Sequence, residues 1–468
     1  MNAEAGASTV PNSFDLTGAA IRHVIHPVWA KVQHPAFARY MREFERNQYL
    51  HPDDLRKLQM RRLRQQLIDA YRYVPFYRHR MTQAGLTPLD IRTHEELRLL
   101  PVLTKRDIQD HQDLLLSSNL PPNNREPHQT GGSTGNPLHF FVDVERFDSR
   151  MASTLRHNSW AGLRIGDWYA HLRSDIGDRP DPNPAWRQTF LYRDLSLHTG
   201  AVSEEELTRF VEVLRRYRPR YMVAHAQSAV LFAEFCKSNN IHDMAFDSMI
   251  VTAEMLLPRE RRILEETFHG KVFDRYGCRE VGVIAGECEY HSGLHVNADA
   301  LIVEVEPAPN LPPGMGRVLV TDLLNRSMPL IRYEIGDLAS LDSDMRCPCG
   351  RSLPLIGKIQ GRTSEFLRPP GSRTIAGPSL ARLAADMRDV RQVQFLERDP
   401  AHVVLKVVTG NGYSQRTEDE LRRRMQPYLE KECNLTIVTA DATSSGSPKK
   451  YEFGKTSQDP ETPTAANQ

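Results

Sequence analysis

The sequence predicts an α/β protein with a large N-terminal domain and a small α+β domain at its C-terminal end. Short runs of β-branched and aromatic residues alternate with helical patterns through the middle of the chain, which favours an α/β arrangement. Beyond residue 360 the pattern changes to two alternating strands, a helix and another strand, at 390–410, 418–433 and 435–440. We therefore expect a large domain over 1–360 and a small one over 361–455. The ends, at about 1–12 and 456–468, are expected to be disordered.

The individual elements follow from local patterns. Apolar residues at helical spacing predict a helix between 55 and 74, with a buried face of Leu55, Leu58, Leu63, Leu67 and Ala70. Ser203 and Glu206 form a capping box for a helix that ends before Pro219. Short apolar runs predict buried strands at 221–226, 248–256, 271–277, 300–306 and 316–324.

The composition excludes several classes of protein. The chain has 468 residues, 40% of them hydrophobic, and a formal net charge of +1. A nucleic-acid-binding or membrane-surface protein would carry a strong basic excess. No apolar run is long enough for a membrane-spanning helix, and the N-terminal residues show no signal-peptide pattern. We expect a cytoplasmic protein with no nucleic-acid or membrane partner.

The segment "TGGSTGNPL", residues 130–138, is rich in glycine and hydroxyl side chains. Glycines let backbone N–H groups approach an anion closely, and hydroxyls add further donors. The segment therefore indicates a phosphate site, with candidates Thr130, Gly131, Gly132, Ser133, Thr134 and Gly135. The alternative is a plain hairpin loop. A nucleoside triphosphatase P-loop is disfavoured because Asn136 stands where that motif has lysine.

Two other segments place a carboxylate next to a glycine turn. "DRYGCREVG" carries Glu280 before an apolar run, and "EIGDL" carries Asp337 after Gly336. The two oxygens of a carboxylate suit the two hydroxyls of a ribose, which is one interpretation of Asp337. Glu280 in a salt bridge and Asp337 in a β-turn are the structural alternatives.

The cysteines suggest a metal site. There are six, too few for a disulfide framework in a chain of this length, and only Cys347 and Cys349 are close in sequence. Together with Cys288 and His291 they could form a tetrahedral Cys₃His site. His291 is preferred to His295 because Cys-x-x-His is the tighter chelate, and His295, nearer the strand "HVNAD", is expected to face the active site. The alternative is a set of free thiols with an unrelated histidine.

Taken in order, the motifs resemble those of the adenylate-forming superfamily, and within it the phenylacetate–CoA ligase family with its capsule-biosynthesis branch. The segments that carry the resemblance extend from "YVPFYRHRM" to "SPKKYEF" and include "TGGSTGNPL", "TAEML", "YGCREVG", "YEIGDL", "CPCGR" and "IQGRTSEFL". The resemblance implies a large multi-sheet adenylate-forming domain that binds ATP and an acid, followed by a small mobile lid domain.

The resemblance also implies roles for individual residues. The loop 130–135 would hold the pyrophosphate end of ATP, with Thr134 among the catalytic residues. Tyr276 and Gly277 would lie at the adenine, Asp337 at the ribose and Arg362 at the domain junction, while Glu280 would hold Mg²⁺. The lid domain would bring a lysine to the reacting carboxylate. Here the ending reads Ser447-Pro448-Lys449-Lys450-Tyr451, without the family's glycine and arginine, so Lys450 fits best and Lys449 is the reserve.

The function that follows is ATP-dependent activation of a carboxylic acid as an acyl-adenylate, with release of pyrophosphate and transfer of the acyl group to CoA or a carrier thiol. ATP, Mg²⁺ and a structural Zn²⁺ are the expected cofactors, with CoA a possible acceptor substrate. Direct amide formation with an amine acceptor is one alternative. A degenerate binding protein with the same fold is another, because the ending is altered. The acid pocket is expected to draw on His157, Trp160, Arg173, Asp175 and His225.

Overall fold

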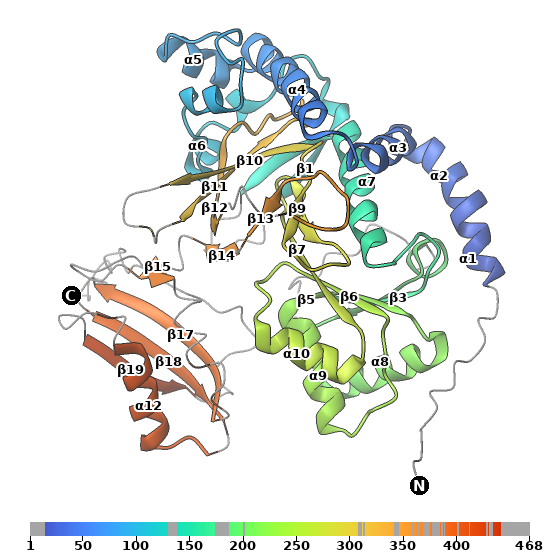
Figure 1. Cartoon of the computed structure of the whole chain (residues 1–468), viewed down its shortest axis with the longest axis vertical. Helices are drawn as coiled ribbons and strands as arrows, with labels where there is room; N and C mark the ends of the chain where they lie inside the picture. Colours follow the sequence, from blue (N-terminus) through green and yellow to red (C-terminus); the bar gives the residue numbers. More distant parts are fainter. Residues whose placement is uncertain are drawn as a thin grey trace, which may run out of the picture.

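An eight-stranded sheet forms the centre of the molecule (Figure 1). The computed structural model describes residues 15–129, 138–173, 187–199, 202–307, 311, 314–340, 346–357, 359–362, 366–367, 375–376, 384, 387, 389–399, 402–410, 412–426, 429 and 434–440. From one edge of the sheet to the other its strands are β13 Leu355–Ile356, β9 Leu294–Val296, β8 Gly282–Glu287, β7 Lys271–Cys278, β6 Ser248–Thr252, β5 Tyr221–His225, β3 Tyr169–Arg173 and β4 Asp194–His198.

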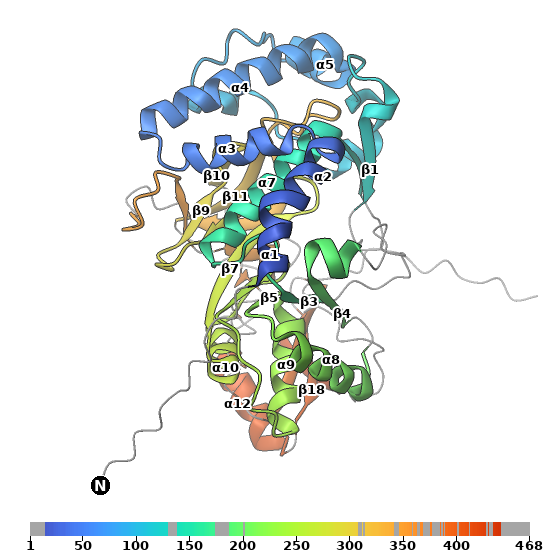
Figure 2. The same cartoon turned by 90° about the vertical axis from the view of Figure 1, so that its right-hand side faces the viewer.

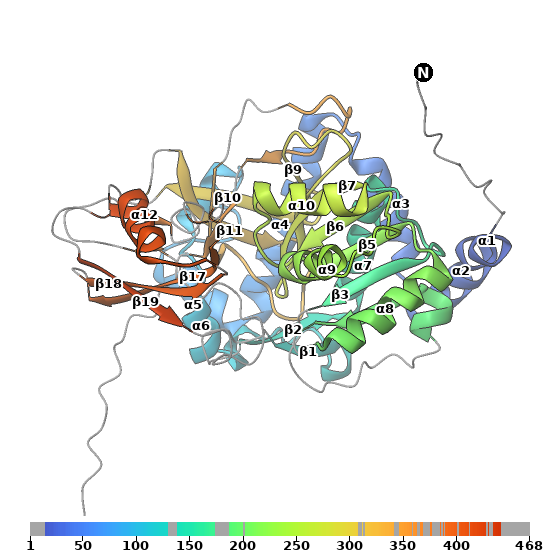
Figure 3. The ribbon, with the colours of Figure 1, turned by 90° about the horizontal axis from the view of Figure 1, so that it is seen from below.

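The strands from β7 to β4 are parallel, whereas β8, β9 and β13 add antiparallel pairs at the other edge. The connecting elements are α7 Val144–Trp160, the π-helical η5 Arg187–Tyr192, α8 Glu204–Tyr217, α9 Ala226–Ser238 and α10 Pro258–Phe268. Figure 3 shows α9 and α10 side by side against the strands. Parallel pairing needs such crossovers. The carboxyl ends of β3, β5, β6 and β7 therefore lie next to one another along one side of the sheet, its carboxyl edge. The predicted α/β class is confirmed.

A second, four-stranded antiparallel sheet lies beside the first. It contains β10 Leu301–Pro307, β11 Met315–Asp322, β12 Tyr333–Ser340 and β14 Ile359–Arg362. A separate hairpin consists of β1 Arg125–Gln129 and β2 His139–Asp143. All five predicted strands are present, in β5, β6, β7, β10 and β11; β5, β6 and β11 are mostly buried as predicted, whereas most residues of β7 and β10 are only partly buried.

Helices cover the N-terminal part of the molecule. They are α1 Leu16–Ala20, the π-helical η1 Ile21–Ile25, α2 His26–Gln33, α3 Phe37–Asn47, α4 Pro52–Tyr73, α5 Pro75–Gln83 and α6 Lys105–Asp110, with 3₁₀ turns η2 Glu95–Leu99, η3 Asp113–Leu115 and η4 Pro122–Asn124. The helix predicted at 55–74 is confirmed as α4, in which Leu55, Leu63, Leu67 and Ala70 are buried and Leu58 is partly buried. Among the described residues, no helix combines the length and apolar character needed to cross a bilayer.

The predicted capping box on α8 is also confirmed. Ser203 accepts the backbone N–H of Glu206 at 3.2 Å, and Glu206 accepts that of Ser203 at 2.8 Å. At the other end, Arg218 adopts a left-handed conformation, so the helix stops before Pro219. The box satisfies two backbone donors that would otherwise lack partners at the start of a helix.

The C-terminal part forms a module with its own core. It contains β15 Phe366–Leu367, β16 Ile375–Ala376, β17 Val390–Asp399, β18 His402–Thr409, α12 Gln415–Met425 and β19 Asn434–Ala440. β17 and β18 are antiparallel, as the alternating pattern predicts, and β19, which follows the helix, runs parallel to β18. Buried residues of the strands pack on Leu421 and Met425 of α12. The domain boundaries themselves stay a prediction.

Candidate active site and metal centre

The β1–β2 hairpin brackets the glycine-rich segment. Gln129 and His139 pair across the two strands, so the hairpin holds the two ends of the segment together. The candidates Thr130, Gly131, Gly132, Ser133, Thr134 and Gly135 lie outside the described residues. Beyond the hairpin, Asp143 accepts the backbone N–H groups of Arg146 at 2.8 Å and Arg326 at 2.6 Å. The hairpin is thereby fixed to the start of α7 and to the turn between β11 and β12.

Tyr276 and Asp337, predicted to contact the adenine and the ribose, meet across the two large sheets. The hydroxyl of Tyr276 on β7 donates to Oδ2 of Asp337 on β12 at 2.7 Å. Residues 335–337 of β12 stand opposite the single residue Val318 of β11, so the strand bulges at this point. Gly336 has a φ of 94°, a left-handed conformation that glycine adopts without strain. The bulge carries Asp337 toward β7.

Glu280 lies in the turn after β7 and is 8% exposed. Its Oε1 accepts the hydroxyl of Tyr333 at 2.9 Å. The next residue is tied to α7, because Nη2 of the fully buried Arg146 donates to the carbonyl of Val281 at 2.8 Å. Arg146 also pairs with Asp322 at 2.8 Å. A buried carboxylate on so fixed a turn is suited to holding a cation.

Arg150 and Arg279 lie beside the start of the glycine-rich segment, and no sequence motif identifies them as phosphate-binding residues. Nη1 of Arg279 donates to the carbonyl of Gln129 at 3.3 Å, and Arg150 donates to the carbonyl of Arg279. Burial and the two guanidinium groups lower the pKa of His128. Burial lowers the pKa of Arg150 to about 10. The turn that carries Glu280 is therefore held against the hairpin in a positively charged environment that suits a polyphosphate.

The carboxyl edge of the parallel strands forms the adjoining surface. Ala253 follows β6 with a φ of 70°, an uncommon conformation for a residue with a side chain. The next residue, Glu254, accepts the backbone N–H of Gln227 at the start of α9 at 2.8 Å. Arg173 and His225, two of the predicted acid-pocket residues, end β3 and β5 at this edge. Asp175 lies outside the described residues.

The other two predicted pocket residues lie in the interior. His157 and Trp160 of α7 are buried, with their rings 4.1 Å apart. Burial, with the nearby Arg156 and Arg275, lowers the pKa of His157 well below its usual range, so the ring is neutral. A Cβ at Gly286 would lie 2.6 Å from Nδ1 of His157. The imidazole can therefore pack against β8 only because residue 286 is glycine. The structure thus separates the four described residues into an edge group, Arg173 and His225, and an interior group, His157 and Trp160.

Three cysteines and a histidine converge next to β9 and β13, at the end of the strand order opposite to β4. The ligand atoms of Cys288, His295, Cys347 and Cys349 all lie within 4.8 Å of one another. Sγ of Cys288 is 3.4 Å from Sγ of Cys347, and Sγ of Cys349 is 3.4 Å from Nε2 of His295. Nδ1 of His295 lies 3.3 Å from the carbonyl of Leu353, which fixes the ring with Nε2 toward the thiols. Three sulfurs, one imidazole and an outer hydrogen bond fit a closed tetrahedral metal site.

The predicted ligand His291 is not part of this cluster. It has a φ of 51°, and its Nδ1 lies 3.0 Å from Oε2 of Glu287 while its ring packs on Phe273. His295 takes the position instead, because β9 pairs with β13 and so passes beside the cysteine-bearing turn. The prediction of His291 as a ligand was wrong, because the turn after Cys288 directs its side chain away from the thiols.

The remaining predicted residues are only partly placed. Gly277 lies on β7, and a Cβ there would come within 2.5 Å of the carbonyl of Gly282, so this turn requires glycine. Arg362 pairs in register with Asp337 across β12 and β14. Lys449 and Lys450 lie outside the described residues.

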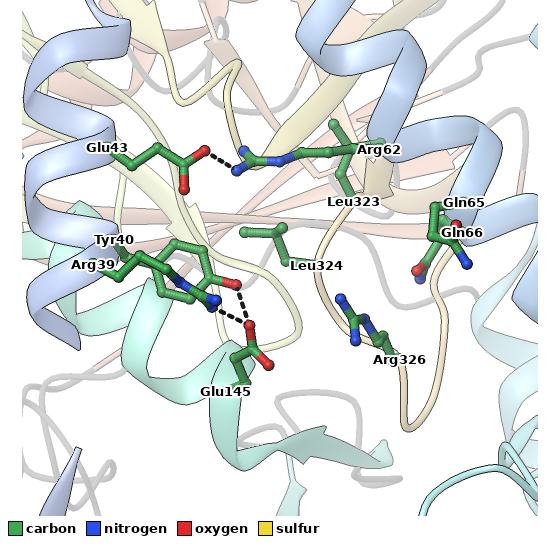
Figure 4. A pocket seen from close by; sticks show the side chains of 10 residues that line it. All are labelled: Arg39, Tyr40, Glu43, Arg62, Gln65, Gln66, Glu145, Leu323, Leu324 and Arg326. Atoms are coloured by element: carbon green, nitrogen blue, oxygen red, sulfur yellow. Dashed lines mark hydrogen bonds and ion pairs between the residues drawn. The ribbon is translucent and has the colours of Figure 1, made fainter. Parts of the chain in front are cut away.

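A cavity of about 230 Å³ opens elsewhere, between α3, α4, the start of α7 and the turn after β11 (Figure 4). Its glutamates are neutralised, because Glu43 pairs with Arg62 and Glu145 pairs with Arg39. Glu145 also accepts the hydroxyl of Tyr40 at 2.9 Å. Apart from Arg326, the charged side chains of this cavity are therefore paired with one another.

Comparison with known proteins shows sequence relatives and similar solved structures. No protein-family model matches the chain. The phenylacetate–coenzyme A ligase of Thermus thermophilus is 28% identical over 335 residues, which cover 67% of this chain and 72% of that enzyme. Protein CapK of Staphylococcus aureus is 22% identical over 372 residues, covering 77% and 79%. A crystal structure of 2-hydroxyisobutyryl-CoA ligase in complex with R3-HIB-AMP superposes with a TM-score of 0.73 at 20% identity, covering 88% and 92%.

The fold is therefore that of an adenylate-forming ligase. Within this class, the sequence relatives support the family that the motifs indicate, and the chain is a homologue of the phenylacetate–CoA ligases and of CapK.

Proposed function

We propose that this protein uses ATP to convert a carboxylic acid to an acyl-adenylate and then transfers the acyl group to CoA. The observation that carries the proposal is the hydrogen bond between Tyr276 and Asp337, beside a buried Glu280 and the hairpin that brackets the glycine-rich segment. The names of the sequence relatives support CoA as the acceptor. A carrier thiol or an amine would replace CoA in the second step only.

The chemistry explains why such a site needs few proton-transfer groups. A carboxylate oxygen of the acid attacks the α-phosphorus of ATP, and the bond to the pyrophosphate oxygen breaks with its electron pair. The thiol of CoA then attacks the acyl carbon, loses its proton, and AMP leaves. Charge develops on phosphate oxygens in the first step, so preorganised donors and cations stabilise the transition state. Mg²⁺, with Glu280 as its ligand, would supply charge neutralisation there.

The described residues suit these roles. Asp337 would accept hydrogen bonds from two ribose hydroxyls once the side chain of Tyr276 moves to stack on the adenine. Arg150 and Arg279 would place positive charge near the β- and γ-phosphates. The acid is proposed to bind at the carboxyl ends of the parallel strands, near Arg173 and His225. Lys450 is proposed to contact the carboxylate and the α-phosphate, and movement of the small domain over 361–455 to deliver it stays a prediction.

The proposal is tested by pyrophosphate release with a panel of aromatic, branched and hydroxylated carboxylic acids. ATP with at least one acid is expected to release pyrophosphate and AMP, and CoA is expected to be consumed in equal amount. Pyrophosphate release that is stimulated by an amine, with CoA left intact, would assign amide formation. No release with any acid, despite normal ATP binding, would indicate a binding protein.

Asp337→Ala is expected to weaken ATP binding by roughly 1.5–3 kcal/mol, the range for hydrogen bonds to a charged group. Tyr276→Phe removes only the hydroxyl that Asp337 accepts in the unliganded protein, so it is expected to change ATP affinity less. Isothermal titration with ATP measures both. Asp243→Ala, which breaks an exposed ion pair with Arg215, is the control and should bind ATP like the parent. Equal ATP affinity in Asp337→Ala and the parent would place the ribose elsewhere.

Glu280→Gln is expected to raise the Mg²⁺ concentration needed for half-maximal pyrophosphate release by on the order of tenfold, because the amide keeps the size but loses the charge. A magnesium titration at saturating ATP measures it. Glu212→Gln on the exposed face of α8 is the matched control. An unchanged magnesium requirement would leave Glu280 as a structural partner of Tyr333.

We further propose that the Cys₃His cluster binds a structural zinc ion. The four side chains complete a tetrahedron without an open position, which is typical of structural rather than catalytic zinc. The ion would join the loop after β8, strand β9 and the turn at 347–349. The cluster lies at the edge of the same sheet that carries Tyr276, so zinc would stabilise the support of the active site and take no part in the reaction.

A further inference from the structure

The first helical segments present an apolar stripe to the surface. α1, η1 and α2 form one continuous helix over 16–33, which Figure 2 shows on the side facing the viewer, with no other element drawn over it. Large apolar side chains recur on it every four residues. The exposed fractions are 73% for Leu16, 60% for Val24, 63% for Val28 and 72% for Val32, and Ala20 is also exposed.

A π-turn keeps this stripe on one face. In a regular α-helix, residues four apart drift by about 40° around the axis, so five such positions would wrap far around it. Here Pro27 cannot donate a backbone hydrogen bond, and the N–H of His26 bonds instead to the carbonyl of Ile21, five residues back. The wider turn rotates each residue by a smaller angle. It therefore counters the drift midway along the stripe.

The opposite face of the helix is firmly seated on the protein. Ile21 is fully buried, and a Cβ at Gly18 would lie 2.5 Å from the carbonyl of Gly166. Arg22 donates to the carbonyl of Ile165 at 2.7 Å and pairs with Asp167 at 2.6 Å. The stripe is thus carried by a fixed helix rather than by a loose terminal segment.

The spacing and charges of the helix suit a second copy of the same helix. Positions 16, 20, 24, 28 and 32 are symmetric about Val24, so two antiparallel helices would place Leu16 opposite Val32 of the other copy. Asp15 at the start of the helix pairs with the buried Arg193, but its side chain is still 52% exposed, and Lys31 near the end of the helix is exposed. Antiparallel pairing brings each acid near the other copy's lysine and opposes the helix dipoles. A membrane-surface helix would instead carry large aromatic or leucine residues and many basic ones.

We propose that this stripe is a self-association surface, in which two copies of the chain pair their N-terminal helices antiparallel about a two-fold axis at Val24. Such an isologous contact needs no other partner. The helix is about 27 Å long, and one face of a single helix of this length buries less area than the roughly 800 Å² per partner of stable complexes. The dimer is therefore concentration-dependent, with dissociation in the micromolar range.

Sedimentation equilibrium tests the proposal between about 1 and about 100 µM protein, the range that brackets such an affinity. The mass of the parent is expected to rise from 53.4 kDa toward twice that value. Val24→Asp places two carboxylates together on the axis, so this variant should stay monomeric. Its melting temperature should match the parent's because the position is exposed. Val213→Asp, at a partly exposed valine of α8, is the matched control and should dimerise normally.

Cysteine cross-linking tests the antiparallel register. Val24→Cys is expected to form an intermolecular disulfide under mild oxidation, above the background of the parent. Leu16→Cys mixed with Val32→Cys should cross-link, whereas Leu16→Cys alone should not, because its two copies would be about 24 Å apart. A parent that stays monomeric throughout, a dimer that Val24→Asp leaves intact, or cross-linking of Leu16→Cys to itself would each overturn the proposal. The proposal would also be overturned if the parent bound lipid vesicles as a monomer and Val24→Asp lost this binding, because the stripe would then be a membrane-binding surface.

Discussion

Replacing Lys450 with alanine is expected to slow pyrophosphate release by roughly 100-fold or more, the scale of losing one preorganised electrostatic group at a transition state. The ammonium group would stabilise charge on the attacking carboxylate and the α-phosphate, and alanine cannot. ATP affinity should change little, because the contact matters most in the transition state. Single-turnover measurements with saturating ATP and acid give the rate of adenylation.

The neighbouring lysine supplies the control for this prediction. Lys449→Ala should adenylate at close to the parental rate, and Lys450→Ala should still convert a chemically made acyl-adenylate to the thioester. If Lys449→Ala is the slow variant, the catalytic role belongs to Lys449. If neither is slow, the altered ending "SPKKYEF" does not supply a catalytic lysine.

The second large effect is expected from the metal centre. Cys347→Ser should lose about one zinc per chain and lower the melting temperature by about 5 °C or more, because binding of a structural metal contributes directly to folding free energy. Elemental analysis and calorimetry measure the two quantities. ATP affinity at a temperature where the variant is folded should change less than stability, because the cluster lies at the far edge of the sheet.

Two histidines four residues apart make this prediction specific. His295→Ala should lose zinc like Cys347→Ser, whereas His291→Ala should keep it, because His291 bonds to Glu287 instead. Cys236→Ser, at a buried thiol outside the cluster, controls for loss of any cysteine. If His295→Ala kept zinc and His291→Ala lost it, the fourth ligand would be His291, as the sequence spacing predicts.

The elements that could be predicted from sequence are those that local interactions determine. The apolar spacing of α4 and the box of Ser203 and Glu206 depend on residues within a turn or two of one another. The strand runs at 221–226 and 248–256 depend on burial alone. The chemistry of a carboxylate after a glycine turn indicated Asp337, and the family resemblance indicated Tyr276. Their contact needs two sheets and the bulge at Gly336, which no local pattern specifies.

The features that could not be predicted depend on contacts between distant segments. His295 joins the cysteines because β9 pairs with β13, more than fifty residues away. The guanidinium of Arg279 contacts the carbonyl of Gln129, on a hairpin 150 residues away in sequence, and no local pattern specifies this contact. The left-handed Ala253 and the π-turn before Pro27 likewise leave no clear trace in composition or periodicity.

The central claim is that the acid is activated at the α-phosphorus of ATP, and an oxygen-isotope experiment tests it most directly. An acid from the active panel, labelled with ¹⁸O in its carboxylate, is incubated with ATP, CoA and the enzyme, and the nucleotide products are examined by mass spectrometry. The account predicts unlabelled pyrophosphate and AMP that carries one ¹⁸O, because the carboxylate oxygen stays with the phosphate when the thiol attacks. Label in inorganic phosphate with formation of ADP would contradict it.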